Sequence, residues 1–366
     1  MKFIIERENL IKPLQAVSGV VERRQTLPIL ANILVNVKTD QLSMTATDLE
    51  VEMQAQVALK GAKPGEITLP ARKFMDICRA LPDQSKIEVT LDGSRAVIRS
   101  GKSRFVLATL PASEFPNIET SKNILSFSIP QGKLKQVIDR THFAMAHQDV
   151  RYYLNGMYLE TDDNVIRMVA TDGHRLALCE TEVKLKIKEN HNIIIPRKGV
   201  LELLRLLQDN DEPAQIHLGT NYINITTKDL GLTSKLIDGR FPDYQNVVPN
   251  GGSKVITCAR EMLRQALNRA SILSNEKYRG IRLQFTKGIL RIFAHNPEQE
   301  EAEEEMVIDY NGDDLEIGFN VNYLLDAITA SAAEQVELAL SDPNSCCLIH
   351  GLGEHDCKYV VMPMRL

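Results

Sequence analysis

The chain has 366 residues, of which 43% are hydrophobic and 25% are charged, and its formal net charge is −5. This composition is ordinary for globular domains with full cores, and the length allows about two to four of them. No apolar run reaches the length needed to span a membrane. The first ten residues carry charge inside their only apolar stretch, so we expect no secretory signal and a cytoplasmic protein.

An amphipathic helix is predicted near the start of three stretches of the sequence, because apolar residues recur there at spacings of three and four. These helices read NLIKPLQAVSGV from Asn9, GKLKQVIDRTHF from Gly132 and EMLRQALNRASI from Glu261. Short alternating apolar runs punctuated by glycine follow each helix and predict strands and tight turns. One of these strands is centred on Ala46, Ala170 and Ala294, which are 124 residues apart in both intervals.

A second helix follows in each stretch, reading RKFMDICRAL from Arg72, RKGVLELLRLL from Arg197 and VNYLLDAITA from Val321. Chance similarity of amphipathic segments is the alternative, but the elements recur in one order at near-constant spacing. The sequence therefore predicts an α+β protein of three repeated domains, each with two helices on antiparallel sheets. We place the domains at residues 1–120, 121–250 and 251–366, because the link Pro249–Gly252 has a composition typical of domain boundaries.

The cysteines show no spacing that predicts a zinc site or a paired redox motif. They are Cys78, Cys179, Cys258, Cys346, Cys347 and Cys357. We expect all six to be reduced thiols, and we expect no metal and no cofactor.

The charges are distributed unevenly. The net charge alone argues against a nucleic-acid partner, since phosphate binding needs cations. Counted with the flanking charges of Arg7–Arg24 and with Arg260, however, the six predicted helical segments carry a net +9, which leaves −14 for the rest of the chain. If all six line one surface, that surface attracts nucleic acid while the remainder repels it. The alternative is that these helices simply carry solvated lysine and arginine.

The two ends of the chain are also complementary, because residues 1–120 carry +2 and residues 251–366 carry −7. A head-to-tail contact between two chains would pair these ends, and two such contacts close a ring. Six helices side by side leave a bore of only about 7 Å, whereas twelve leave about 24 Å. A B-form duplex is about 20 Å across, so a dimer is the smallest ring that admits one.

Motifs along the whole chain resemble the bacterial DNA polymerase III β subunit family, the β sliding clamps. They include PARKFMDICR, AHQDVRYYLNGM, VATDGHRLA, SKLIDGRFPDY, ILSNEKYRGIRL, NPEQEEAEE and YVVMPMRL. The resemblance implies three clamp domains in a head-to-tail homodimer, a six-domain ring around double-stranded DNA that binds without sequence specificity. It also implies partners: the polymerase III catalytic subunit, a separate ATP-dependent clamp loader, and other replication and repair proteins.

Weak, non-specific phosphate contacts suit sliding, so long cationic side chains on the helices are the expected DNA contacts. Together with residues of the AHQDVRYY segment, the expected set is Arg24, Arg72, Lys73, Gln148, Tyr152, Tyr153, Arg197 and Lys198. The tyrosines could equally be core residues.

The resemblance further implies a pocket for short partner peptides, which need an apolar cleft with a few polar anchors. Its walls would be Arg151, Tyr153, Leu154, Thr171, Gly173, His174, Arg175, Leu176, Pro242, Val247, Tyr278, Asn320, Tyr323, Val360, Val361, Met362, Pro363, Met364 and Arg365. Methionine suits such a site because it adapts to several ligands. Without the resemblance, Met362 and Met364 read as ordinary strand packing. The chain departs from the family pattern at Asn246, Tyr278, Asn344 and Cys346, which puts partner affinity in doubt.

The expected dimer interface combines a basic strand of the first domain with an acidic run of the third. It comprises Lys73, Lys102, Arg104, Phe105, Leu107, Ile272, Leu273, Glu298, Glu300, Glu301, Glu303 and Glu304. The run could also be a solvated loop.

Two other function classes remain open at this point. In an enzyme, Asp172 and His174 could form an acid/base pair, but this is a weak signal and the third repeat has Asn296 and Glu298 in that region. No phosphate-cradling loop or HExxH or GxSxG motif is present in the sequence. A DNA-binding module that forms no ring would retain the charge argument but leave the complementary ends unexplained.

Overall fold

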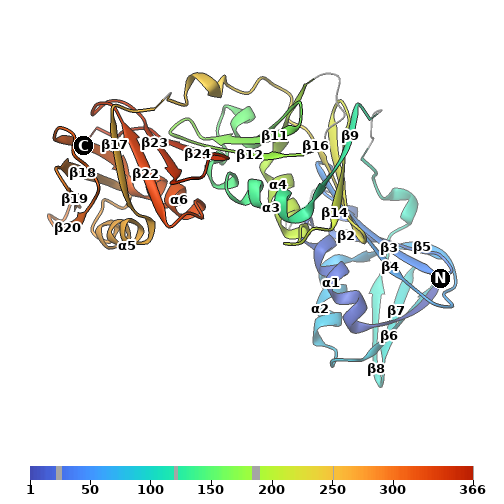
Figure 1. Ribbon diagram of the computed structural model, residues 1–366. Helices are drawn as coiled ribbons and strands as arrows, with labels where there is room; N and C mark the ends of the chain where they lie inside the picture. Colours follow the sequence, from blue (N-terminus) through green and yellow to red (C-terminus); the bar gives the residue numbers. More distant parts are fainter. Residues whose placement is uncertain (22–26, 119–122, 184–189, 250, 366) are drawn as a thin grey trace. The chain divides into compact units, whose positions relative to one another are not determined.

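The computed structural model describes residues 1–21, 27–118, 123–183, 190–249 and 251–365, and Figure 1 shows its course. The described residues form six α-helices and 24 strands, and each third of the chain contributes two helices and eight strands. The predicted α+β fold of three repeated domains is confirmed. The chain divides into two compact units, Met1–Lys135 with Lys198–Leu236, and Gln136–Arg197 with Ile237–Leu366.

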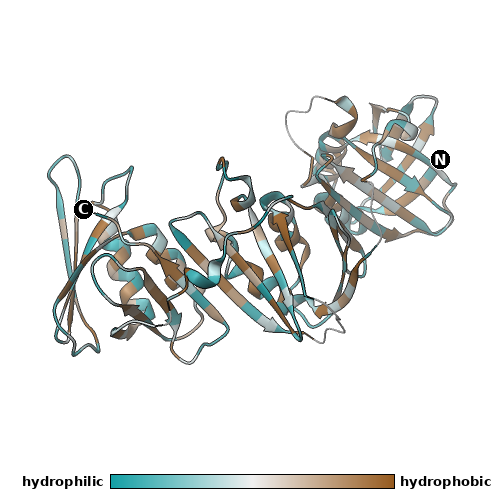
Figure 2. Cartoon of the chain, turned by 90° about the horizontal axis from the view of Figure 1, so that it is seen from above, coloured by the Kyte–Doolittle hydropathy of each residue, from teal (hydrophilic) through white to brown (hydrophobic). Residues whose placement is uncertain are grey.

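The first unit contains two antiparallel sheets. The smaller has the order β1 (Lys2–Glu6), β6 (Lys86–Asp92), β7 (Arg95–Ser100), β8 (Ser103–Ala108). The larger has the order β5 (Gly65–Pro70), β2 (Asn32–Val37), β3 (Gln41–Thr47), β4 (Val51–Ala58), β16 (Leu230–Lys235), β15 (Tyr222–Thr226), β14 (Pro213–Leu218), β9 (Leu125–Pro130). Hydrophobic and hydrophilic colours alternate along many strands in Figure 2. In β4, buried and more exposed residues alternate from Val51 to Gln56, which is the pattern of a strand with one buried face.

Helices of the first unit pack on these sheets. Helix α1 (Arg7–Ser18) contacts β3 and β4, and also contacts α2 (Ala71–Ala80). It buries Leu10, Leu14 and Val17, which lie on one face because they are four and three residues apart. Helices α3 (Gln131–Asp139) and α4 (Arg197–Leu206) belong to the central repeat, and the division between the units falls within each of them.

The second unit also has one large and one small antiparallel sheet. The large sheet has the order β13 (His191–Pro196), β10 (Gly156–Asp162), β11 (Val165–Thr171), β12 (Arg175–Glu182), β24 (Cys357–Val361), β23 (Cys347–Gly351), β22 (Gln335–Leu340), β17 (Lys254–Ala259). The small sheet has the order β20 (Glu301–Val307), β19 (Ile289–His295), β18 (Gly280–Thr286), β21 (Leu315–Asn320). Helix α5 (Arg260–Ser271) covers β19 and β20, and α6 (Val321–Ala330) packs against α5 and β24.

Each large sheet joins two successive repeats edge to edge. Strand β4 of the first repeat pairs with β16 of the second, and β12 of the second repeat pairs with β24 of the third. These two pairings, which we call the junctions, occupy equivalent places in the repeats. The central repeat is therefore shared between the two compact units, one half of its strands in each.

The expectation that all six cysteines are reduced thiols is wrong for one pair. Cys179 and Cys357 are joined by a disulfide, while Cys78, Cys258, Cys346 and Cys347 are free. The two residues are 178 positions apart in sequence, but they face each other across the β12–β24 junction. Sequence spacing could not reveal the pair because the register of two distant strands brings it together.

Candidate functional site

An apolar pocket of about 180 Å³ lies in the second unit. Its lining residues come from the ends of β11, β12 and β24 and from the short 3-10 helices Tyr152–Leu154 and Tyr244–Asn246 with their neighbours. They are Arg151, Tyr153, Leu154, Thr171, Gly173, Arg175, Leu176, Pro242, Tyr244, Val247, Val360 and Met362. The structure thus brings together 11 of the 19 residues expected to form the peptide pocket, in a cavity with mostly apolar walls.

The floor of this apolar pocket is a buried cluster. Leu154, Leu176 and Val360 are at most 3% exposed, and they pack with one another and with Tyr244. Such a rigid apolar base with polar side chains at its rim suits a short peptide with apolar anchors.

Tyr244 is a pocket residue that sequence reasoning missed. Its hydroxyl donates to Glu160 at 2.5 Å and accepts from Arg167 at 3.2 Å. Burial raises the pKa of the Tyr244 hydroxyl, so it stays protonated and keeps donating. The one available signal was its place in the RFPDYQ motif, between the expected Pro242 and Val247.

The other eight expected pocket residues lie outside the lining of the cavity. They are His174, Tyr278, Asn320, Tyr323, Val361, Pro363, Met364 and Arg365. Val361 is 1% exposed and directly follows the pocket-lining Val360 on β24, so its side chain lies on the opposite face of the sheet. The backbone N–H of Met362 donates to the carbonyl of His174 at 2.9 Å, which holds the chain beyond β24 at the pocket rim.

The residues around α6 form a second group beside Arg175. The side chain of Asn320 donates to the carbonyl of Tyr278 at 3.2 Å, and the Arg175 guanidinium lies 4.5 Å from the ring centre of Tyr323. The backbone N–H of Met364 donates to the carbonyl of Gly318 at 2.8 Å. Pro363 and Arg365 lie on either side of Met364 in this terminal segment.

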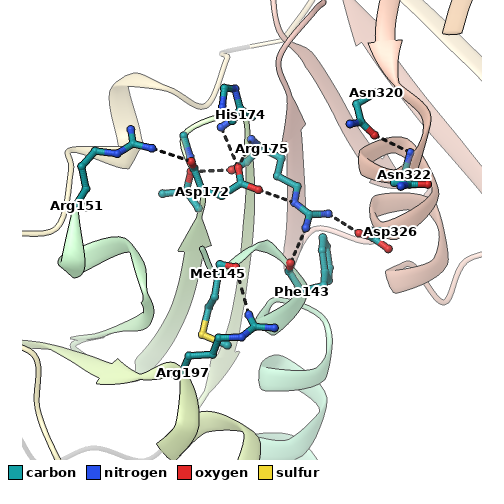
Figure 3. Close-up of polar contacts among 12 residues, drawn as sticks. Phe143, Met145, Arg151, Asp172, His174, Arg175, Arg197, Asn320, Asn322 and Asp326 are labelled. Carbon is teal, nitrogen blue, oxygen red and sulfur yellow. Dashed lines mark hydrogen bonds and ion pairs between the residues drawn. The ribbon is translucent and has the colours of Figure 1, made fainter. Parts of the chain in front are cut away.

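Arg175 connects this group to the apolar pocket (Figure 3). Its guanidinium contacts the Asp172 carboxylate at 3.1 Å and the Phe143 carbonyl at 2.7 Å, and it also pairs with Asp326. With its side chain only 14% exposed, Arg175 fixes three separate segments of the chain. It is therefore a structural anchor at the edge of the pocket.

The geometry does not support the acid/base pair of the enzymatic alternative. The Asp172 carboxylate accepts from the backbone N–H groups of His174 and Arg175 at 2.9 and 3.0 Å and pairs with the Arg175 side chain. These bonds form a turn, and the carboxylate is held by the backbone and guanidinium rather than by the His174 ring. Figure 3 shows these contacts converging on Asp172.

A second ion pair lies at the rim of the apolar pocket. Arg151 donates to the Asp149 carboxylate at 2.8 and 3.0 Å and to the Asp172 carbonyl at 3.0 Å. The hydrogen bonds from Arg151 lower the pKa of Asp149 to about 2. The acid is therefore ionised at neutral pH and holds the Arg151 side chain in place.

The four departures from the family pattern lie at or near this surface. Asn246 is exposed and donates to Asp243 at 2.8 Å, and Tyr278 is 53% exposed. Cys346 packs against the buried cluster beneath the pocket, whereas the backbone N–H of Asn344 donates to Asp342 at 2.8 Å.

A basic groove of about 840 Å³ lies among the helices of the first unit. Its lining includes the cationic side chains Lys12, Arg72, Arg79 and Arg205, carried by α1, α2 and α4. Lys73 is exposed on α2 next to Arg72. The clustering of cations on helices that the charge pattern predicted is thus present in this unit.

The remaining expected DNA contacts are placed differently. The Lys198 ammonium contacts the Val20 carbonyl at 3.2 Å and pairs with Asp48, and Arg197 donates to the Met145 carbonyl at 3.2 Å. Gln148 and Tyr152 are exposed in the second unit, so Tyr152 is not a core residue, while Tyr153 lines the apolar pocket. Arg24 lies outside the described residues.

The expected interface residues gather at two sheet edges. Strand β8 ends its sheet and exposes Arg104, and the turn just before it exposes Lys102, while Phe105 is half-buried and Leu107 is buried. Strand β20 ends the other small sheet and exposes Glu301, Glu303 and Glu305.

Other expected interface residues surround β20. Glu304 pairs with Arg269 of α5 at 2.7 Å, and Glu298 and Glu300 are exposed just before the strand. Ile272 is 74% exposed at the end of α5, beside the half-buried Leu273.

Among the residues that the structure covers, no helix is both long and apolar enough to cross a membrane. One group in this part of the chain has metal-ligand spacing, namely Cys179, Asp356 and Cys357. Its two sulfurs are joined to each other in the disulfide, so they are not free to bind an ion.

Comparisons with known proteins agree with this architecture. The chain is 55% identical to the beta sliding clamp of Pseudomonas aeruginosa and 51% identical to that of Escherichia coli, and each match covers 100% of both chains. It matches the crystal structure of the DNA polymerase III subunit beta from P. aeruginosa with a TM-score of 0.97 at 55% identity, again over 100% of both chains. A polymerase III beta structure from Caulobacter crescentus matches with a TM-score of 0.93 at 38% identity over 100% of both chains.

The fold and these likenesses define a DNA sliding clamp, a class of non-catalytic processivity factors. The N-terminal, central and C-terminal domains of the DNA polymerase III beta subunit match residues 1–119, 128–243 and 245–365. The chain belongs to the DNA polymerase III beta subunit family.

Proposed function

We propose that two copies of this chain close head to tail into a six-domain ring around duplex DNA and tether the replicative polymerase to it. The domains extend over residues 1–120, 121–250 and 251–366, and the ring works in the cytoplasm after a separate ATP-dependent loader has opened it. Other replication and repair proteins share it through the apolar pocket. The observation that carries this proposal is the repeated junction between strands.

The junction pattern leaves one pairing of the repeats unused. By their places in the repeats, β4, β12 and β20 are equivalent, and so are β8, β16 and β24. Within the chain, β4 pairs with β16 and β12 pairs with β24. Only β20 and β8 then remain, and a second chain supplies each with its partner. A ring of two chains uses every junction, whereas a lone chain leaves β8 and β20 without the neighbour that each equivalent strand has.

The internal junctions also predict the register of this third one. Met53 and Ala177 lie opposite the repeat alanines Ala46 and Ala170, and across the junctions they face Leu232 and Tyr359. In the third repeat, Ala302 lies opposite Ala294 and so takes the place of Met53.

The partner position on β8 follows from the neighbouring strand. Leu232 of β16 pairs with Ile225 of β15, and Tyr359 of β24 pairs with Ile349 of β23. The equivalent pair in the first repeat is Phe105 of β8 with Ile98 of β7. Ala302 should therefore face Phe105 of the partner chain.

Antiparallel pairing then sets Glu303 opposite Arg104 and Glu305 opposite Lys102. Opposite charges that face each other across strands stabilise the pairing and select the correct partner edge.

The expected DNA contacts are the cations of the helices, with Arg24, Arg72, Lys73, Arg197 and Lys198 on the inside of the ring and Gln148, Tyr152 and Tyr153 near its edge. Such contacts hold phosphates without reading bases, which permits sliding. The ion pair between Lys198 and Asp48 makes Lys198 the weakest contact of this set, because its charge is already shared.

The apolar pocket is the proposed site for partner peptides, with the segment around Tyr278, Asn320 and Tyr323 as its extension. A sliding clamp from P. aeruginosa has been crystallised with griselimycin. We propose that griselimycin binds this chain in the apolar pocket. Deleting Met364 to Leu366 should abolish that binding while the dimer persists, and retained binding would refute the assignment.

Retention on DNA of different topology tests the ring. After loading, the protein should stay on a nicked circle and leave within minutes once the circle is cut, since encirclement ends when DNA has a free end. Neutralising Arg24, Arg72 and Arg197 together should reduce loading and retention but leave the dimer intact. Equal dissociation from circular and linear DNA would exclude encirclement and favour a groove-binding module.

A further inference from the structure

We propose that the disulfide between Cys179 and Cys357 is a redox-dependent staple that keeps the apolar pocket assembled. The inference rests on the proposed role of that pocket in binding partner peptides. Whether the bond across the β12–β24 junction is oxidised or reduced then changes the affinity of the pocket for its peptide ligands.

The disulfide and the pocket lie on opposite faces of the same pair of strands. Leu176 faces Val360 across the β12–β24 junction, and both line the pocket. Cys179 faces Cys357 three positions further along. Because side chains alternate between the faces of a sheet, the odd-numbered cysteines point away from the even-numbered Leu176 and Val360.

The pocket therefore depends on the junction that the disulfide closes. Its walls come from both strands, with Leu176 on β12 and Val360 on β24, while Met362 follows directly after β24. Any fraying of β24 from β12 separates these walls. A covalent bond between the strands prevents such opening and keeps the pocket preformed, which favours peptide binding.

The other internal junction provides a comparison. At the equivalent place, β4 presents Ala55 opposite Leu230 of β16, a pair that cannot form a covalent bond. Across both compact units as described, the disulfide is confined to the junction that carries the apolar pocket. Sheet pairing alone is thus sufficient at one junction, and the added bond at the other coincides with a binding site.

The surroundings of the disulfide favour Cys357 as the sulfur that leaves as a thiolate when the bond is reduced. The Arg140 guanidinium donates to Cys357 Sγ at 3.5 Å and is 13% exposed, and it lies 3.5 Å from Asp356 and 3.6 Å from Glu354. A neighbouring guanidinium stabilises a thiolate, so Cys357 is the better leaving group. The same cation disfavours a metal ion between the sulfurs and Asp356.

The reaction partner is a dithiol reductant. Its thiolate attacks Cys179 Sγ, the bond between the two sulfurs breaks, and Cys357 leaves as a thiolate beside Arg140. The second thiol of the reductant then displaces Cys179 and forms the reductant's own disulfide. Two electrons pass to the protein, and the two protons from the reductant's thiols end on the cysteines. Because both sulfurs are buried, attack requires a transient opening of the junction.

Counting thiols tests the bond itself. The full-length protein is unfolded in guanidinium with N-ethylmaleimide, and its mass is measured. Four of the six cysteines should be modified before reduction and all six after treatment with dithiothreitol. Six modified cysteines in the protein before reduction would overturn the proposal.

Binding of griselimycin tests the coupling. The reduced dimer and the variant Cys179→Ala/Cys357→Ala should both bind about three-fold more weakly than the oxidised dimer, if the competent pocket is then populated about one third of the time. Cys258→Ala removes a buried free cysteine elsewhere in the same unit and should preserve the redox response. Equal affinity of the oxidised and reduced forms would overturn the staple. Absence of binding to every form would instead overturn the assignment of the pocket and, with it, the coupling.

Discussion

Charge reversal at the proposed ring closure gives a sharp test of the strand register. The register proposed from the internal junctions sets Glu303 of one chain opposite Arg104 of its partner, and both side chains are exposed at sheet edges. Arg104→Glu should weaken the dimer because it sets two carboxylates against each other. Adding Glu303→Arg in the same chain should restore the opposite charges at both closures.

The size of the effect follows from the exposure of the pair. An exposed cross-strand ion pair contributes up to about 1 kcal/mol, and like charges in its place are unfavourable by a similar amount, so a change of about 1 kcal/mol per closure is a moderate expectation. Dissociation of the ring opens two equivalent closures. The single variant should therefore lose about 2 kcal/mol, which is about a 30-fold increase in the dimer Kd.

Sedimentation of diluted protein measures this Kd directly, and the loss should shrink at high salt because the pair is exposed. Arg282→Glu is a matched control. Arg282 lies on β18 and forms an exposed ion pair with Glu316 of β21. Strand β19 separates β18 from β20, so this pair is away from the proposed interface. This control should leave the Kd within about two-fold of the original. A double variant that dimerises no better than Arg104→Glu would refute the register.

Three further predictions concern the folded chain. Arg175→Met should lower the free energy of unfolding, measured in urea, by about 2 kcal/mol because it leaves half-buried carboxylates unpaired. The control Arg282→Met removes an exposed pair and should lower it by less than about 1 kcal/mol. Equal losses in the two variants would contradict the anchoring role of Arg175. Arg151→Ala should raise the pKa of Asp149 from about 2 toward its ordinary value in a carboxyl NMR titration, and an unchanged midpoint would remove Arg151 as the cause. Since that pKa is lowered in the folded state, the stabilisation is present above the ordinary carboxyl pKa and is lost as the pH falls through about 2. Burial raises the pKa of Glu202, so Glu202→Gln should stabilise the fold near neutral pH and lose this advantage below the ordinary carboxyl pKa, and a gain that persists in acid would point to another cause.

The repeats could be predicted because they are encoded in local periodicity. The segment from Val321 gives an apolar stripe at spacings of three and four, and α6 begins and ends as this stripe does. The alanines at 124-residue intervals fall at equivalent places in three hairpins, where each faces the same position of the next strand. Patterns of this kind depend on neighbours in the sequence and therefore survive without a structure.

The features that sequence reasoning missed depend on contacts between distant segments. Cys179 and Cys357 meet only because β12 and β24 share one register. Tyr244 belongs to the pocket because Glu160 and Arg167, on other strands, hold its hydroxyl. Periodicity carries no signal for such pairs.

The sequence also predicted the charge of the helices better than it predicted the contacts of single side chains. The sequence showed that the helices are basic, yet it could not show that the Lys198 ammonium is paired with Asp48, 150 residues away. It also could not separate Val361, which faces the core, from Val360, which faces the pocket, until the register of β24 was known.

The opposite charges of β8 and β20 have a consequence for direction. Two basic edges repel each other, as do two acidic ones, so copies of the chain join only in one sense. A two-membered ring built this way has its rotation axis along the hole, and equivalent surfaces then share one side. The proposed ring has a front and a back, and its two apolar pockets lie at the same level along the hole. A partner that docks at either proposed site then meets the duplex with the same polarity.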